Sequence, residues 1–302
     1  MSSTDALTLH YRMETARPAA APRLERATSL LFIGFLLLTF IGTHPLQTGS
    51  VDQRADGSIL DRIVVFSLFG LALSVIWMAR DVALRTITRN VGLIFIIAFC
   101  IASITWSAFP GLTLRRSVLL FLLTAISFAI AVGATDLRRL HTQLFLTLAA
   151  VVLFNILVTI AVPGEAITPI GVKGIYTQKN VAGIVGLITL VVGATWMVGA
   201  GKRRILFALL VMAMAFGFLV ATKSRTSMNL ALLGVMTVAF VAMAEKFGAA
   251  FIVASGVLGA LGLAAGLVWL GLYDFDFGSA VAAIIGDASY SGREELWAFA
   301  RA

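Results

Sequence analysis

The chain alternates between long apolar runs and short polar breaks, a pattern that is typical of membrane-spanning helices. The hydrocarbon core of a bilayer requires about 20 apolar residues for each helical span. The runs are continuous and do not alternate residue by residue, so they favour helices over a β-barrel. We therefore predict an all-α polytopic membrane helix bundle with about nine transmembrane helices, at 28–44, 62–79, 91–109, 117–134, 143–162, 180–200, 204–221, 227–244 and 249–272.

The composition supports this class of protein. Of the 302 residues, 60% are hydrophobic and 13% are charged, whereas a soluble domain has about 25% charged residues. A soluble protein could not cover so large an apolar excess, because its surface requires polar side chains. The single cysteine, Cys100, excludes an intramolecular disulfide and a cysteine-based metal cage.

The polar ends of the chain divide it into three parts. Residues 1–27 are polar, contain several arginines and are not followed by a signal-peptide cleavage site, so they predict a mobile cytoplasmic tail. Residues 28–272 form the predicted bundle, and residues 273–302 begin a large loop on the outer face. Basic residues are slightly more frequent on the side that a cytoplasmic N-terminus places inside, which is the usual bias.

Three predicted helices begin on the outer face with a cation at or next to their first residue. A helix N-terminus carries a partial positive charge and unpaired N–H groups, so it can bind an anion. Arginine would hold phosphate oxygens in a fork, whereas lysine would act as a point charge. If the three helices pack together, they form an anion site; the alternative is that these cations reach lipid headgroups. The residues concerned are Arg115 and Arg116 before the fourth span, Lys179 and Asn180 at the sixth, and Lys223, Arg225, Thr226 and Ser227 at the eighth.

Four sequence motifs then suggest a family. They occur in the order ITWSAFPGLTLRRS (104–117), GIYTQKNVAG (174–183), TKSRTS (222–227) and SGREELW (291–297). Each is short, but the ordered set on a multispan chain resembles the O-antigen ligase and exopolysaccharide polymerase family over about residues 30–302.

The resemblance implies an inverting, metal-independent glycosyltransferase without a cofactor, built like the C-type membrane glycosyltransferases. Such an enzyme takes a glycan linked to undecaprenyl pyrophosphate and transfers it to a hydroxyl of another glycan or of the lipid A core. It works at the periplasmic face of the bacterial inner membrane, among membrane lipids and other polysaccharide-assembly proteins. The basic residues beside the spans then serve the membrane and not a nucleic acid.

The resemblance also points to residues that bind the donor pyrophosphate, namely Arg115 or Arg116, Lys179, Arg225 and Arg293. Asn180, Lys223 and Thr226 join this set from the predicted anion site at the helix starts. Members of the family carry a His-Asn motif in a large outer loop, and its histidine is the general base. This chain contains His10, His44 and His141, and none of them matches that motif. The catalytic base is therefore unassigned, and we expect the chain to be a C-terminally truncated form that lacks it.

Several other features have structural interpretations. Ser291 and Glu294 fit a capping box at the start of a short interfacial helix. Asp274 and Asp276 match a metal-binding pattern that a lipid-pyrophosphate donor does not require. The glycines between 256 and 266 predict close helix packing, and Asn155 and Thr159 predict hydrogen bonds between helices.

A membrane transporter of lipid-linked sugar or of a small anion is the main alternative function, and a non-catalytic envelope assembly protein, which needs no general base, is a third. A transporter is expected to have charges near span midpoints and interrupted helices in corresponding halves. In this sequence the charges lie at span ends, which favours the transferase.

Overall fold

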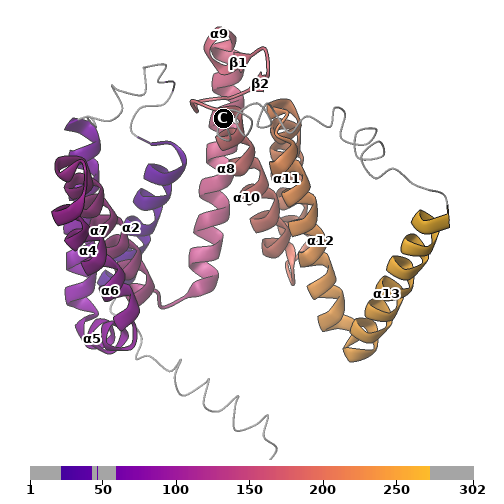
Figure 1. Ribbon diagram of the computed structural model, residues 1–302, viewed down its shortest axis with the longest axis horizontal. Coiled ribbons are helices and arrows are strands. Elements are labelled where there is room, and N and C mark those ends of the chain that lie inside the picture. Colours follow the sequence, from indigo (N-terminus) through magenta and orange to yellow (C-terminus); the bar gives the residue numbers. More distant parts are fainter. Residues whose placement is uncertain (1–21, 43–45, 47–58, 273–302) are drawn as a thin grey trace, which may run out of the picture. The chain divides into compact units, whose positions relative to one another are not determined.

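The computed structural model describes residues 22–42, 46 and 59–272 (Figure 1). The chain forms two compact units, residues 1–238 and 239–302, and each is considered by itself. Most of the predicted cytoplasmic tail and the predicted outer loop lie outside the described residues. So do the predicted features at His10, His44, Asp274, Asp276, Ser291, Arg293 and Glu294.

The first group of helices in the first unit surrounds a small apolar core. Its helices are α2 (Pro22–Phe40), α4 (Ile59–Met78), α5 (Arg80–Arg89), α6 (Val91–Ala102) and α7 (Pro110–Gly133), with a 3-10 helix at Ser103–Trp106. Helix α7 packs against all of the others. Leu31, Val75 and Ile126 are fully buried where α2, α4 and α7 meet, so apolar packing holds this group together.

The second group includes the predicted anion site. It contains α8 (Leu137–Ala161), the short α9 (Pro163–Ala166), the strands β1 (Ile167–Thr168) and β2 (Gly171–Val172), α10 (Lys179–Met197), α11 (Lys202–Thr222) and the start of α12 (Arg225–Phe247). Helices α8, α10 and α11 pack against one another, and α2 joins them through α8. Val151, Val185 and Leu219 lie in their shared core.

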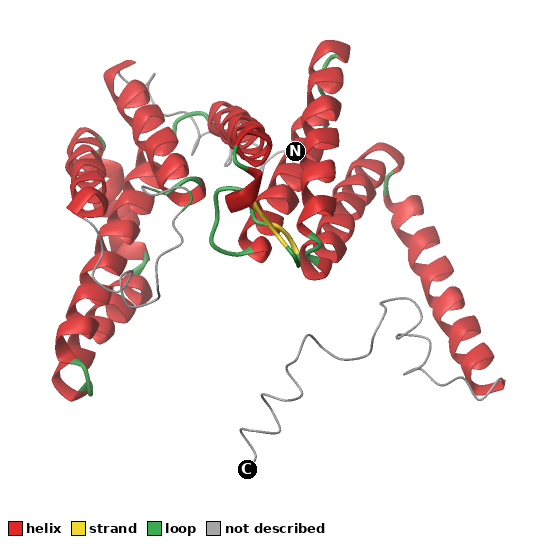
Figure 2. Cartoon of the chain, turned by 90° about the horizontal axis from the view of Figure 1, so that it is seen from above, coloured by secondary structure: helices red, strands yellow, loops and turns green. Residues whose placement is uncertain are grey.

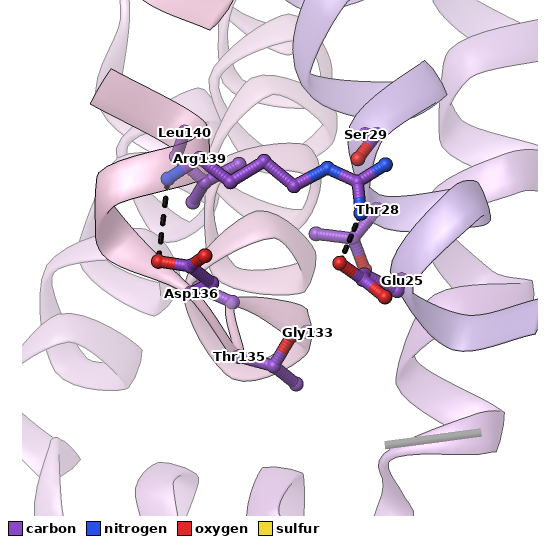
Figure 3. A pocket seen from close by; sticks show the side chains of 9 residues that line it. Glu25, Thr28, Ser29, Gly133, Thr135, Asp136, Arg139 and Leu140 are labelled. Carbon is purple, nitrogen blue, oxygen red and sulfur yellow. Dashed lines mark hydrogen bonds and ion pairs between the residues drawn. The ribbon is translucent and has the colours of Figure 1, made fainter. Parts of the chain in front are cut away.

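At one end of α8, charged groups are paired with one another. Asp136 caps the helix by accepting hydrogen bonds from the backbone N–H groups of Arg138, at 2.9 Å, and Arg139, at 3.3 Å. The Arg139 side chain extends from α8 to α2 and forms an ion pair with Glu25 (Figure 3). A small hollow between these groups is lined by Thr28, Gly133 and their neighbours. Glu25 belongs to the first group of helices and Arg139 to the second, so the ion pair ties the two groups together.

The second unit contains the last part of α12 and α13 (Ala249–Leu272). The ring of Phe251 lies beside the rings of Phe240 and Phe247, with centroids 5.4 and 6.1 Å away. The glycines from Gly256 to Gly266 face open space. Among the described residues of this unit nothing packs on these glycines, and the close helix packing predicted there stays a prediction.

Every predicted apolar run forms a helix, but the number of candidate spans is smaller than predicted. Among the described residues, seven helices are long and apolar enough to cross a membrane, or eight if α5 and α6 with the 3-10 helix form one bent span. Helix α2 is not one of the seven; it begins at Pro22, earlier than predicted, and its first turns contain Arg23, Glu25 and Arg26. Many large apolar side chains on these helices are exposed, as expected for surfaces that face lipid. The protein is therefore a multi-pass membrane protein.

Candidate anion-binding site

The connection between α8 and α10 folds into a small hairpin at the C-terminal end of α8. Strands β1 and β2 are antiparallel, with Ile167 opposite Val172 and Thr168 opposite Gly171 (Figure 2). The Thr168 hydroxyl donates to the Gly171 carbonyl at 2.6 Å, which closes the turn. The backbone N–H of Lys173 then donates to the carbonyl of Ala166 at 2.9 Å. This bond fixes the end of the hairpin next to Gly174, the first residue of the GIYTQKNVAG motif.

The hairpin lies against the C-terminal end of α11. Gly171 has a φ of +138°, and a Cβ at this position would lie 2.4 Å from the carbonyl oxygen of Thr222. Only glycine accommodates both the backbone conformation and the close approach. The Lys179 ammonium group donates to the carbonyl of Ile170 at 2.9 Å, so the first residue of α10 is tied to the turn of the hairpin.

Asn155 in α8 binds the segment that leads to α10. Its Oδ1 accepts from the backbone N–H of Ile175 at 3.1 Å, and its Nδ2 donates to Val151 O at 2.9 Å and to the Tyr176 hydroxyl at 3.4 Å. Asn155 therefore bonds to a loop and to its own helix, and the prediction of a bond between helices is wrong for it. The same correction applies to Thr159, whose hydroxyl donates to Asn155 O at 2.7 Å. Asn155 turns to the loop because the loop supplies a buried backbone N–H beside it.

The N-termini of α10 and α12 meet at Gly183. A Cβ at Gly183 would lie 2.7 Å from the Cβ of Ser224 and 2.8 Å from the hydroxyl of Ser227. The Ser224 hydroxyl lies 2.9 Å from the Ser227 hydroxyl and 3.3 Å from Oδ1 of Asn180. The absence of a side chain at Gly183 thus brings the first turns of two helices, and their N–H groups, to one place.

The turn between α11 and α12 holds a cation in an uncommon backbone conformation. Lys223 adopts the left-handed region with φ +53° and ψ +31°, which costs about 1–2 kcal/mol for a residue with a Cβ. Its side chain is exposed, as are those of Arg225 and Thr226, whereas Thr222, Ser224 and Ser227 are buried. Backbone strain of this kind is frequent at functional sites. The turn therefore presents two cations above a buried cluster of hydroxyl groups.

The two sequence segments that build this region are basic. The segments 162–181 and 219–230 contain Lys173, Lys179, Lys223 and Arg225, and their one acidic residue is Glu165. Two helix N-termini add partial positive charge to these side chains. Hydroxyl and amide groups around Ser224 supply uncharged donors. The arrangement suits an oxyanion such as phosphate more than a metal ion, and no group of three or more metal-ligating side chains occurs among the described residues.

Arg115 and Arg116 belong to the other group of helices. The sequence predicts that they precede their span, but α7 begins at Pro110, where proline suits the first turn, so both arginines lie inside the helix. Helix α7 packs against α2, α4, α5, α6 and the 3-10 helix, whereas α10 packs mainly against α8 and α11. Of the three predicted helix starts, the structure brings α10 and α12 together. The assignment of Arg115 and Arg116 to the same anion stays a prediction.

Apart from Ser227, the sequence-based site lacked the residues that bring its members together. Thr222 and Ser224 are buried, as is Ser227, and Ser224 and Ser227 lie next to Gly183. Gly171 and Gly174 allow the segment before α10 to approach α11 and α8. A signal was present in the sequence, because glycines and hydroxyl residues recur within both motifs. Their pairing was not predictable, since the contacts join segments about 40 residues apart.

His141 has a structural environment in this fold. Its Nε2 lies 3.0 Å from the hydroxyl of Thr195 near the end of α10. The neighbouring Trp196 donates from Nε1 to Thr142 at 3.2 Å and stacks with Phe145 at a centroid distance of 4.7 Å. This cluster lies near the start of α8, away from the hairpin at its other end.

Comparison of the chain with protein-family models, with curated proteins and with solved structures found no match.

Proposed function

We propose that the protein is a membrane glycosyltransferase that uses a glycan linked to undecaprenyl pyrophosphate as its donor. The acceptor is a hydroxyl of another glycan or of the lipid A core, and the site faces the periplasm from the inner membrane. The observation that supports this proposal best is the meeting of the α10 and α12 N-termini at Gly183, each helix beginning with a cation, Lys179 or Arg225.

The chemistry of such a transfer fits this arrangement. The acceptor hydroxyl attacks the anomeric carbon, the bond from that carbon to the phosphate oxygen breaks, undecaprenyl pyrophosphate leaves with the electron pair, and the hydroxyl proton is released to water. Negative charge therefore grows on the pyrophosphate in the transition state. Fixed N–H groups and cations stabilise such charge, and the loss of one donor typically costs about a hundredfold in rate. In this proposal Lys179, Lys223 and Arg225 bind the pyrophosphate, and Asn180 and Thr226 add uncharged donors.

A binding measurement tests the proposal directly. The full chain is placed in lipid nanodiscs and titrated with undecaprenyl pyrophosphate, in parallel with Arg225→Ala and Arg203→Ala. Arg203 is an exposed arginine in the first turn of α11, so it is a matched control. We expect Arg225→Ala to weaken binding by about tenfold or more, because hydrogen bonds to charged groups contribute about 1.5–3 kcal/mol. No binding by the unchanged chain, or equal binding by both variants, would contradict the proposal.

A transporter is the second candidate, and one observation favours it. Helix α5 and the segment of α6 with the 3-10 helix meet at an angle of 78°, and interrupted helices are common in transporters. However, α5 contains Arg80, Asp81, Arg85 and Arg89 within ten residues, which is typical of a helix at the membrane surface. Movement of undecaprenyl pyrophosphate across liposomes by the purified chain, without transfer to an acceptor, would favour this candidate.

A further inference from the structure

A buried polar link connects helix α8 to the 173–178 loop and, through that loop, to α2. Asn155 is fully buried, and Ile175, whose N–H it accepts, is 3% exposed. Buried backbone N–H groups are almost always paired. If Asn155 were apolar, the Ile175 N–H would have no partner at this depth in the protein. The asparagine thus fixes the backbone of the motif four residues before Lys179.

Gly174 makes this link possible from the loop side. Its φ is +58°, and a Cβ there would lie 2.3 Å from Oδ1 of Asn155 and 3.2 Å from the ring of Phe218. Any side chain at position 174 would therefore push the loop away from α8. The contact between the loop and α8 therefore requires both residues: Asn155 supplies the hydrogen bond from α8, and Gly174 lets the loop come close enough to make it.

Tyr176 continues the link to α2. Its hydroxyl donates to the carbonyl of Phe40 at 2.5 Å while it accepts from Asn155. The carbonyl of Ile175 accepts from the backbone N–H of Leu46 at 2.9 Å. Burial raises the pKa of Tyr176 to about 12, and the Asn155 hydrogen bond lowers it. The phenol is therefore neutral and able to donate throughout the physiological range.

We infer that Asn155 is a positioning residue for the anion site: it holds the 173–178 loop on α8 so that the first turn of α10 lies beside Ser224. Two ties carry its effect to the site. Lys179 donates to Ile170 O on the hairpin side, and Asn180 lies 3.3 Å from Ser224 on the α12 side. Asn155 does not contact the bound anion itself. The ligand in this inference, a pyrophosphate, rests on the proposed function; the position of the loop does not.

The position of the loop is tested by titration of Tyr176. Replacing Tyr11, Tyr273 and Tyr290 with Phe leaves Tyr176 as the single tyrosine of the chain. Its phenolate absorbance should then have a midpoint near pH 12. In Asn155→Ala we expect the midpoint to fall towards about 10, the value of an exposed tyrosine.

The direction of the change distinguishes release of the loop from loss of one bond. If the loop stayed in place and its burial were unchanged, loss of the Asn155 bond by itself would raise the pKa of Tyr176, because that bond lowers it. An unchanged or higher midpoint in Asn155→Ala would therefore overturn the inference. Deuterium exchange at Ile175 gives a second reading near neutral pH, with an increase of about tenfold or more expected for a released amide.

Two further variants keep the test decisive. Gly174→Ala displaces the loop from the other side and should produce the same fall in midpoint and the same exchange, even if Asn155→Ala does not fold. Thr189→Val is the control, because Thr189 is fully buried and its hydroxyl donates to Val185 O within its own helix; it should change neither reading.

Binding of undecaprenyl pyrophosphate then separates the two proposals. If the unchanged chain binds it, Asn155→Ala and Gly174→Ala should each weaken binding by about tenfold, as expected when supporting residues no longer hold a site in place. If the unchanged chain does not bind it, the proposed function fails, while the titration still decides whether Asn155 holds the loop. Release of the loop with unchanged binding would overturn the positioning role.

Discussion

The two ends of helix α8 use charge in different ways. At Asp136 and Arg139 each charge has a partner: the carboxylate caps the helix, and the guanidinium pairs with Glu25 across to α2. At the hairpin end, the buried groups are uncharged, Asn155, Thr222 and Ser224, and the cations Lys179 and Arg225 stand at helix N-termini. The ion pair at the first end holds two helices together, whereas the second end places two cations and two helix N-termini near buried hydroxyl groups, an arrangement that suits an anion.

The length of α8 makes this contrast relevant to the membrane. Its 25 residues span about 37 Å at 1.5 Å per residue, more than the hydrocarbon thickness of about 30 Å. The two ends should therefore lie at opposite membrane surfaces. The sequence predicts that Asp136 faces the cytoplasm and the hairpin faces the outside.

The largest expected effect is the labelling of these two ends from opposite sides. In a Cys100→Ala background, Thr226→Cys should react with an impermeant thiol reagent added to intact cells, and Thr135→Cys should react only after permeabilisation. Both threonines are exposed, so access and not burial decides the result. The reverse pattern would invert the predicted orientation, and labelling of both from one side would end the comparison between the two surfaces.

The next effect concerns the approach of α10 to α12. Gly183→Val should weaken binding of undecaprenyl pyrophosphate by about tenfold or more and lower stability by about 1–3 kcal/mol, the usual cost of overpacking. The reason is that its Cβ would lie 2.7 Å from Ser224. Titration in nanodiscs and thermal unfolding measure the two quantities. Gly217→Val in α11, where a Cβ meets nothing within 4 Å, is the control and should leave binding intact.

A smaller effect is expected at Lys223, where stability and binding should change in opposite directions. Lys223→Gly should raise stability by about 1 kcal/mol, since glycine adopts φ +53° without steric cost. The same change removes a cation and should weaken binding of the pyrophosphate. Lower thermal stability of the variant would show that Lys223 makes a stabilising contact that outweighs the backbone strain.

The smallest effect is expected at the charged end of α8. Glu25→Gln should lower stability by about 0–1 kcal/mol, because the side chains of Arg139 and Glu25 are 41% and 36% exposed and solvent screens their attraction. Binding of undecaprenyl pyrophosphate should not change, since this pair lies at the other end of α8. A loss of binding comparable to that of Arg225→Ala would mean that the two ends act together.

Much of the fold follows from the sequence, for a simple reason. Lipid requires continuous apolar helices, so each apolar run predicted a helix, and the bounds agree within a few residues for α4, α10, α11, α12 and α13. The predictions were less accurate at α2, α7 and α8, which begin six or seven residues earlier than predicted, and at α6. Helix α2 begins among charged residues, and α6 ends at Ala102 before a 3-10 helix and the loop at Ser107. Local charge and polar breaks alter the ends of helices without altering the apolar pattern.

The sequence predicts the cations and helix starts of the candidate site, but not which helices come together to form it. The cations at Lys179 and Arg225 and the helix starts at the same positions are local features, and the sequence predicts both. The sequence also grouped Arg115 and Arg116 with them, although α7 packs within the first group of helices. Packing between segments that are distant in the chain decides which helix N-termini meet. No local sequence pattern encodes such packing.

The sequence by itself determined that this is a helical membrane protein with cations at particular helix ends, because hydropathy and charge act locally. The tertiary structure decided that Gly183 joins α10 to α12 and that Asn155 receives the 173–178 loop. It also decided that Arg139 pairs with Glu25. Such contacts depend on three-dimensional packing. The sequence does not show which helices will touch; a glycine that allows close approach, or one buried amide that needs a partner, decides it.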